Sequence, residues 1–179
     1  CSHLYLAIEG KLAGVICIED PLREEAEAVV NSLKRAGITK VVMMTGDSER
    51  TAAAIAKRVG VDEYYSEVLP EDKAGFIEKE KAAGRKVIMI GDGINDSPAL
   101  SAANVGIAIS DGAEIAREIA DITVGSDDLY QIVTLKLLSD SLMKRIRGNY
   151  RFIVSFNLGL ILCGVAGILQ PTTSALLHN

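Results

Sequence analysis

Residues 87–100 read VIMIGDGINDSPAL, and this stretch decides the fold that the sequence predicts. Its apolar start indicates a buried strand, and Pro98 near its end is typical of the first turn of a helix. Between them lies a glycine-containing turn with two carboxylates, Asp92 and Asp96. We therefore expect a strand, an acidic turn and a helix in direct succession.

The same alternation of apolar runs and helical patterns extends on both sides of this stretch. Short apolar runs separated by helices indicate a parallel sheet covered on both faces. The predicted fold is therefore α/β, with a doubly wound parallel sheet. Predicted strands are residues 40–44, 86–90, 105–109 and 121–124, and predicted helices are residues 51–59, 70–83, 97–103 and 112–119.

The first part of the chain predicts a β-hairpin and then a helix. Residues 4–18 alternate around a turn at Glu9, Gly10 and Lys11. Asp20 is expected as an N-cap and Pro21 as the first helical residue, in a helix that runs to Gly37. Because the chain begins at Cys1 and enters a strand pattern at once, we expect it to be a piece of a longer protein.

The last part of the chain predicts a membrane segment. Residues 153–169 contain no charged side chain, and 17 helical residues span roughly 25 Å, near the lower limit for crossing a bilayer. Lys144, Arg145, Arg147 and Arg151 precede this run, which favours a cytoplasmic position for that end. We predict a stalk helix, a span at about residues 152–169 and a second span from about residue 174. A buried core helix is the alternative.

These patterns divide the chain into three parts. Its charge and its cysteines argue against a nucleic-acid-binding protein and against a small protein held together by disulfides or zinc. Residues 1–18, 19–127 and 128–179 are the predicted hairpin, sheet domain and stalk with its membrane region. The net charge of −5, from 19 basic and 24 acidic residues, does not indicate nucleic-acid binding. The three cysteines are far apart, so neither a disulfide framework nor a zinc knuckle is predicted, and the domain is expected in a reducing cytosol.

Two predicted strands end in similar loops, Thr45-Gly46-Asp47-Ser48 and residues 91–96. Ligands bind beyond the carboxyl ends of such strands, and the N-terminus of the following helix favours an anion. If the strands are neighbours, both loops line one crevice. Carboxylates beside an anion require a cation between them, so we expect Mg²⁺ together with a phosphoryl group.

Each of these residues also has a purely structural interpretation. Asp96 or Ser97 could cap the helix that Pro98 begins, and Asp47 or Ser48 could cap the helix that begins near Thr51. Lys73, taken alone, is typical of a solvated helix lysine. Asp92 lies between two glycines after a strand and has no capping position.

The ordered set of motifs resembles a known family. MTGD (44–47), PEDK (70–73) and GDGINDSPALSAANVGIAI (91–109) are similar to motifs of the haloacid dehalogenase superfamily, and in particular to the phosphorylation domain of heavy-metal-transporting P-type ATPases. EDPLRE (19–24) resembles the hinge that leads into that domain. The resemblance therefore implies that residues 1–18 are the end of the family's nucleotide-binding domain and the hinge strand, and that residues 19–127 are the C-terminal part of the phosphorylation domain. The resemblance covers nearly the whole chain.

The resemblance implies catalytic roles for five residues. It also implies two cofactors, Mg²⁺ and ATP. Thr45 and the Gly46 backbone would hold phosphoryl oxygens, and Asp47 would lie near the nucleotide or phosphate. Lys73 would neutralise charge on the transferring group. Asn95 would hydrogen-bond the phosphoryl group.

It also implies a magnesium site and two further cofactor contacts. Asp92 would ligate Mg²⁺ and Asp96 would support that site, while Asp20 and Gly93 are expected to contact the cofactor.

One part of the family pattern is missing from the chain. The nucleophile of the family is an aspartate in a D-K-T-G-T motif, which does not occur here. Asp20 follows an apolar run, but its surroundings match the hinge. We therefore predict that these 179 residues alone form no aspartyl phosphate and have no ATPase activity.

The transported ion is expected to be a transition-metal cation. Asn157, His178 and Asn179 are its candidate ligands, although Asn157 is equally explained by a hydrogen bond between helices. Cys163 is interpreted as a small buried residue. This donor set favours manganese, iron or zinc over copper(I).

The expected partners are the metal cation, the lipid bilayer and the upstream part of the same polypeptide, with no nucleic acid. The expected location is a bacterial plasma membrane, in a multi-pass protein whose residues 1 to about 150 are cytoplasmic. Two alternatives stay open: a soluble phosphatase of the same superfamily and a non-catalytic regulatory fragment. The phosphatase would need its own nucleophilic aspartate.

Overall fold

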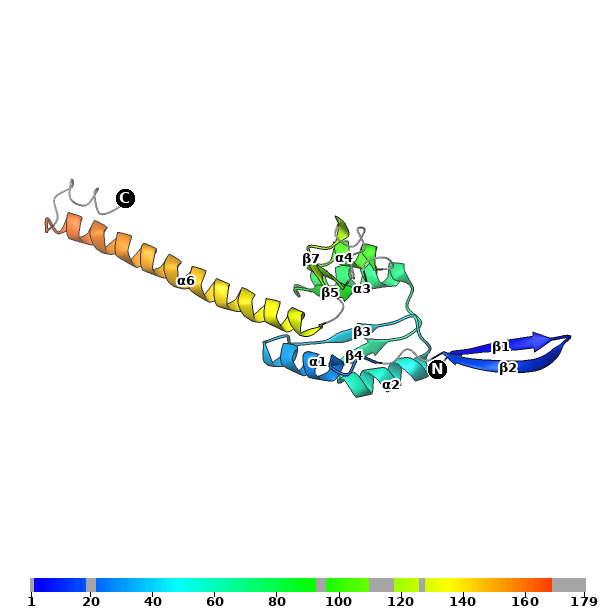
Figure 1. Cartoon of the computed structure of the whole chain (residues 1–179). Helices are drawn as coiled ribbons and strands as arrows, with labels where there is room; N and C mark the ends of the chain where they lie inside the picture. Colours follow the sequence, from blue (N-terminus) through cyan, green and yellow to red (C-terminus); the bar gives the residue numbers. More distant parts are fainter. Residues whose placement is uncertain (1, 19–21, 93–95, 110–117, 126–127, 169–179) are drawn as a thin grey trace. The chain divides into compact units, whose positions relative to one another are not determined.

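The structure is a computed structural model, and it describes residues 2–18, 22–92, 96–109, 118–125 and 128–168 (Figure 1). The chain divides into two compact units, Cys1–Val133 and Thr134–Asn179. The boundary between them falls inside one long helix, α6 (Tyr130–Val165).

The first unit begins with the predicted hairpin. Strands β1 (Ser2–Ile8) and β2 (Lys11–Ile18) pair antiparallel. The two turn residues, Glu9 and Gly10, have φ angles of 49° and 74°. Positive φ at both central positions is the geometry that matches the twist of a two-residue hairpin, and the glycine adopts it without strain. The hairpin prediction is confirmed.

A two-stranded parallel sheet follows the hairpin, together with two helices. Strand β3 (Val42–Met44) pairs with β4 (Glu63–Tyr65), and α2 (Glu49–Val59) connects them. Because β4 has only three residues and exposes two of them, it has no apolar run, and the sequence did not predict it. Helix α1 (Ala26–Arg35) precedes β3.

The prediction for α1 was wrong at its start. The helix begins at Ala26 with Glu25 as its N-cap, five residues after the predicted Pro21. The predicted cap Asp20 and Pro21 lie outside the described residues. The C-terminal end agrees better, because Ala36 caps the helix and Gly37 follows with a φ of 94°. Such a left-handed residue after the last turn favours glycine.

An ion pair ties the end of α1 to the loop before β4. Lys34 donates to the Asp62 carboxylate at 2.6 Å and to the Gly60 carbonyl at 2.8 Å, and Asp62 also accepts the Val41 N–H at 2.7 Å. The backbone conformation at Gly60, with a φ of 78°, ends α2 there. This contact fixes the loop that aligns β4 beside β3.

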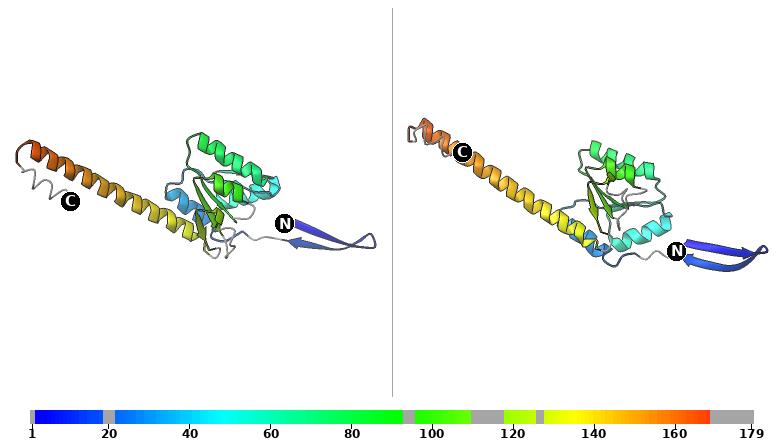
Figure 2. Two further views of the ribbon diagram at one scale, coloured as in Figure 1. Left: turned by 90° about the horizontal axis from the view of Figure 1, so that it is seen from above. Right: turned by 45° about the horizontal axis from the view of Figure 1, so that its top comes forward.

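The second parallel sheet holds the centre of the predicted site. Strands β5 (Ile88–Gly91), β6 (Val105–Ile109) and β7 (Ile122–Val124) lie in that order. Helices α3 (Pro70–Ala82) and α4 (Ser97–Ala102) pack on each other, and α4 also packs on β5 and β6 (Figures 1 and 2). These parallel strands with helical connections confirm the α/β fold.

The core of this sheet is small and tightly closed. Leu100 of α4 and Ala108 of β6 are fully buried, and three partly buried side chains pack around them: Met89, Ile119 and Ala120. A Cβ on Gly106 would lie 2.7 Å from the Leu100 carbonyl oxygen. Since real Cβ atoms do not approach so closely, only glycine lets α4 sit this near to β6.

The second unit consists of most of α6. The whole helix has 36 residues, about 54 Å at 1.5 Å per residue. Among the described residues, it is the one helix long and apolar enough to cross a membrane by length and composition. Its large apolar side chains from Phe152 onward are mostly exposed.

Candidate functional site

The predicted site is centred on the carboxyl end of β5. The strand ends at Gly91, Asp92 follows directly, and Asp96 is the N-cap residue of α4. Two carboxylate residues thus follow the last residue of the strand within five positions of the sequence. Two other predicted residues of this loop, Gly93 and Asn95, lie outside the described residues.

Lys73 and Asp96 form a salt bridge at this position. The distance from Lys73 Nζ to Asp96 Oδ1 is 2.7 Å, and the two side chains are only 16% and 12% exposed. They come together because α3 packs against α4. Charges with so little access to water are stable only when paired, so each holds the other in place.

This pair corrects both structural interpretations of its members. Lys73 is not a solvated helix lysine, because its ammonium group is largely buried against a carboxylate. The Asp96 side chain makes no capping hydrogen bond to α4, although the residue occupies the N-cap position. Its carboxylate is directed to Lys73 instead.

Gly91 is a site residue that the sequence reasoning missed. A Cβ on Gly91 would lie 2.8 Å from Asp96 Cβ and 2.9 Å from Asp96 Cγ. The missing side chain therefore makes the space in which the Asp96 carboxylate packs on the end of β5. The two glycines around Asp92 in the sequence were the available signal, but only Gly93 was assigned a role.

The loop after β3 forms a compact turn around Thr45. The Thr45 hydroxyl donates to Asp47 Oδ2 at 2.8 Å and accepts the Asp47 N–H at 3.1 Å. The segment after β4 closes over the loop, because the N–H groups of Val68 and Glu67 donate to the carbonyls of Thr45 and Asp47 at 3.0 and 2.9 Å. Ser48, the N-cap of α2, makes no side-chain capping hydrogen bond.

A second cluster lies beside this loop. Glu49, the first residue of α2, accepts hydrogen bonds from the hydroxyls of Tyr64 (2.7 Å) and Ser66. These two hydrogen bonds, that of Ser66 first, lower the pKa of the Glu49 carboxyl group, and the same carboxylate raises the pKa of the Tyr64 hydroxyl. The sequence contained no signal for this cluster, because it depends on the unpredicted strand β4.

The two predicted loops do not belong to neighbouring strands in this structure. The condition for one shared crevice, that the two strands are direct neighbours, is not met among the described strands, because β3 pairs with β4 whereas β5 pairs with β6. Within the described residues, Thr45 is hydrogen-bonded to Asp47 and to the segment after β4, whereas Lys73 is bonded to Asp96. The predicted site residues therefore form two groups, one at the end of each sheet.

The donor groups at β5 suit a magnesium ion. The described residues contain no cluster of three or more His, Cys, Asp or Glu side chains that could enclose a metal. A closed structural zinc site takes four such protein ligands. Mg²⁺ differs, since it keeps several waters and takes one or two carboxylates plus phosphate oxygens. Asp92 and Asp96 supply that number.

One candidate ligand for a transported metal, Asn157, lies in the second unit, as does Cys163. Asn157 and Cys163 lie in α6 and are partly exposed, and Cys163 is a free thiol. The predictions for His178, Asn179 and Asp20 fall outside the described residues.

Comparisons with known proteins agree with the motifs. Residues 3–104 match the haloacid dehalogenase-like hydrolase family. The chain is 45% identical to a copper-transporting ATPase of Rhizobium meliloti over 98% of its length, and 40% identical to a manganese-exporting P-type ATPase of Mycobacterium bovis over 99%. It spans only 21% and 25% of those two relatives.

The fold comparison leads to the same group of proteins. A crystal structure of a zinc-transporting PIB-type ATPase matches 92% of the chain with a TM-score of 0.74 at 32% identity. The chain covers 27% of that structure. Because this match covers 92% of the chain, it includes residues of both the sheets and the long helix.

Proposed function

Because the chain belongs to the haloacid dehalogenase-like hydrolase family, we propose that it supplies the magnesium and phosphoryl-binding groups of an ATP-driven transition-metal pump. Its homologues are heavy-metal-transporting P-type ATPases. The observation that carries the proposal is the largely buried pair of Lys73 and Asp96 at the end of β5, the strand that Asp92 follows. Phosphoryl transfer needs a cation to stabilise the charge on the phosphoryl oxygens and carboxylates to hold a metal ion, and this arrangement offers both.

In this proposal Lys73 stabilises the negative charge that spreads over the phosphoryl oxygens during transfer. Asp96 positions the ammonium group, because their 2.7 Å contact holds Lys73 Nζ at the end of β5. Gly91 contributes by leaving room for the Asp96 side chain. The low exposure of Lys73 strengthens the attraction between its ammonium group and a bound phosphoryl group.

Asp92 and Asp96 would hold Mg²⁺, which when bound neutralises charge on the phosphate oxygens. The support for this assignment is the donor chemistry alone, namely two carboxylates from one short loop. ATP is the proposed phosphoryl donor, because the homologues are ATPases.

Thr45 would bind a phosphoryl oxygen through its hydroxyl group. That hydroxyl donates to the Asp47 carboxylate at 2.8 Å, so a phosphoryl oxygen would replace Asp47 as the acceptor. The Gly46 backbone would add a second donor. A repelled Asp47 carboxylate would then turn away from the phosphate, towards the bound nucleotide.

The nucleophilic aspartate would come from the upstream polypeptide of the whole protein. Among the described strands, β3 and β5 each have one hydrogen-bonded neighbour, so each has one edge available. Ile88 and Ile90 of β5 are 43% and 36% exposed. A strand paired with both edges would join the two sheets and place its own carboxyl end between Thr45 and Asp92.

Phosphorylation of the complete protein by labelled ATP tests this function. The unchanged protein should form acid-stable, hydroxylamine-sensitive label that requires Mg²⁺, and Asp92→Asn should abolish most of it. The 179 residues alone should form no such label. Hydrolysis of a small phosphate ester by these 179 residues would instead support the soluble phosphatase.

We further propose that α6 enters the membrane and that the transported ion is a transition-metal cation. The length and composition of α6 support the first point. The names of the homologues, which include copper, manganese and zinc transport, support the second and do not select one metal. In this arrangement residues 1 to about 150 are cytoplasmic, in a multi-pass protein of the bacterial plasma membrane.

A further inference from the structure

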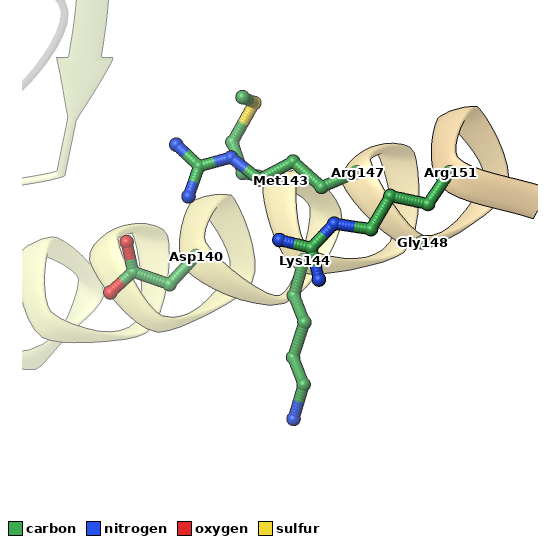
Figure 3. A pocket seen from close by; sticks show the side chains of 6 residues that line it. All are labelled: Asp140, Met143, Lys144, Arg147, Gly148 and Arg151. Atoms are coloured by element: carbon green, nitrogen blue, oxygen red, sulfur yellow. The ribbon is translucent and has the colours of Figure 1, made fainter. Parts of the chain in front are cut away.

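One face of α6 carries a hollow lined by positive charges. Lys144, Arg147 and Arg151 line it together with Asp140 and Met143, and Gly148 lies among them (Figure 3). The spacing of three, four and seven residues places the three cations on one side of a helix. Arg145 belongs to the same turn but lies about 100° away from Lys144 around the axis.

Residues 134–179 offer these cations a single side-chain carboxylate, and it is paired elsewhere. Asp140 is the only acidic residue between positions 129 and 179, and it forms an ion pair with Lys136. Residues 134–179 contain five Lys or Arg and one Asp, a net charge of +4, which leaves −9 for residues 1–133 because the whole chain carries −5. The hollow is thus the strongly basic part of an acidic protein.

Gly148 lies in the hollow and leaves space there. No atom lies within 4 Å of a Cβ placed on this residue, so the space above its backbone is open. A glycine in a helix interior weakens the helix, and here no close packing or positive φ requires it. Its effect in the structure is room for a group to approach between the side chains of Lys144 and Arg151.

The type of side chain changes along α6 after the hollow in the order expected for a helix that enters a membrane. Tyr150, an amphipathic ring, is 68% exposed, and the rings of Phe152 and Phe156 stack at 5.9 Å. Leu158 and Leu162 continue the face of Lys144 and Arg151 by helical periodicity and are 55% and 60% exposed. In membrane helices, cations lie at the headgroups, aromatic rings at the interface and apolar side chains in the hydrocarbon layer, and α6 has these three types in the same order.

We propose that this hollow binds the phosphate headgroup of an anionic phospholipid, whose acyl chain lies along Leu158 and Leu162. Arginine suits phosphate because its planar group donates two parallel hydrogen bonds, and two of the three cations are arginines. The continuity of the basic hollow with an exposed apolar face argues for a lipid over a soluble phosphate. The inference rests on the membrane insertion of α6 proposed above.

Photo-cross-linking in the complete protein tests the proposal. The protein is reconstituted in phosphatidylcholine vesicles that contain a photoactivatable lipid probe. The probe carries its photoactivatable group on the acyl chain and is phosphatidylglycerol in one sample and phosphatidylcholine in the other. Labelling of residues 152–165 is then measured by mass spectrometry. We expect phosphatidylglycerol to label this segment several-fold more than phosphatidylcholine does.

Matched variants separate a site from a general attraction to charge. Arg147→Gln should lower the preference for phosphatidylglycerol about fivefold, the effect of one cation near an anionic surface. Arg145→Gln, which removes the same charge from another face, should leave most of the preference. Gly148→Leu should fill the hollow and lower the preference without loss of helix, since leucine is the better helix former.

Three results would overturn the proposal. Equal labelling by the two lipids, or equal effects of Arg145→Gln and Arg147→Gln, would mean that no specific headgroup site exists. Absence of labelling by either lipid, in protein that floats with the vesicles, would mean that other helices cover this face. Failure to float with the vesicles would overturn membrane insertion as well.

Discussion

Lys73 of α3 and Asp96 at the start of α4 place an ammonium and a carboxylate 2.7 Å apart, with less than a fifth of either side chain exposed. The two residues are 23 positions apart in the chain. Their contact joins the two helices that pack at the end of β5. A substitution at either position should therefore affect both the stability of this part and the proposed phosphoryl transfer.

Lys73→Met should lower the free energy of unfolding by about 3 kcal/mol, because it leaves the Asp96 carboxylate buried without its cation. Thermal unfolding followed by circular dichroism measures the change. Lys79→Met, on an exposed part of the same helix, is the control and should change stability by less than about 0.5 kcal/mol. Similar losses for both variants would contradict the role of the pair.

A second variant separates charge burial from packing. Asp96→Asn combined with Lys73→Met removes both charges and should cost less than the sum of the two single substitutions. An additive result would mean that the two groups do not interact in solution.

Gly91→Ala should disturb the Asp96 carboxylate, because the new methyl group would lie 2.8 Å from Asp96 Cβ. We expect a loss of about 1–3 kcal/mol in stability and a large loss of magnesium-dependent phosphorylation in the complete protein. Gly75→Ala in α3 is the matched control, since nothing lies within 4 Å of its Cβ. The control should be neutral or slightly stabilising.

The pH dependence of stability should depend in part on Asp62. The hydrogen bond from Lys34, and then that from the Val41 N–H, lowers the pKa of the Asp62 carboxyl group below its ordinary 3.8. A lowered pKa in the folded state contributes stability that is present above the unfolded value and is lost as the pH falls through the folded value. Asp62→Asn should therefore flatten the loss of stability below about pH 4. Denaturant unfolding at several pH values checks this, and an unchanged acid slope would contradict it.

The metal preference can be tested on the complete protein with a panel of ions. We expect ATP hydrolysis to be stimulated by manganese, iron(II) or zinc more than by copper(I), because the candidate ligands are amide and imidazole groups. Asn157→Ala should weaken that stimulation if the amide contacts the ion. Stimulation by copper(I) alone would contradict the preference.

Much of the fold was predictable because it depends on local patterns. The hairpin turn at Glu9 and Gly10, the strand at residues 105–109 and the helix that starts at Pro70 follow from turn residues, apolar runs and a proline, and all three occur as expected. The start of α1 and the strand β4 were not predictable in this way. Their positions depend on pairing and packing with distant residues.

The sequence by itself determined which chemical groups follow the strands, since motif order and strand ends are properties of the chain. The resemblance of its motifs to a known family grouped Thr45, Lys73, Asp92 and Asp96 as one set. The tertiary structure decided which of them meet: Lys73 with Asp96, and Thr45 with Asp47. It also decided that β3 and β5 are not hydrogen-bonded neighbours. Contacts between distant residues depend on how helices pack and which strands pair, and a local pattern carries no information about the partner.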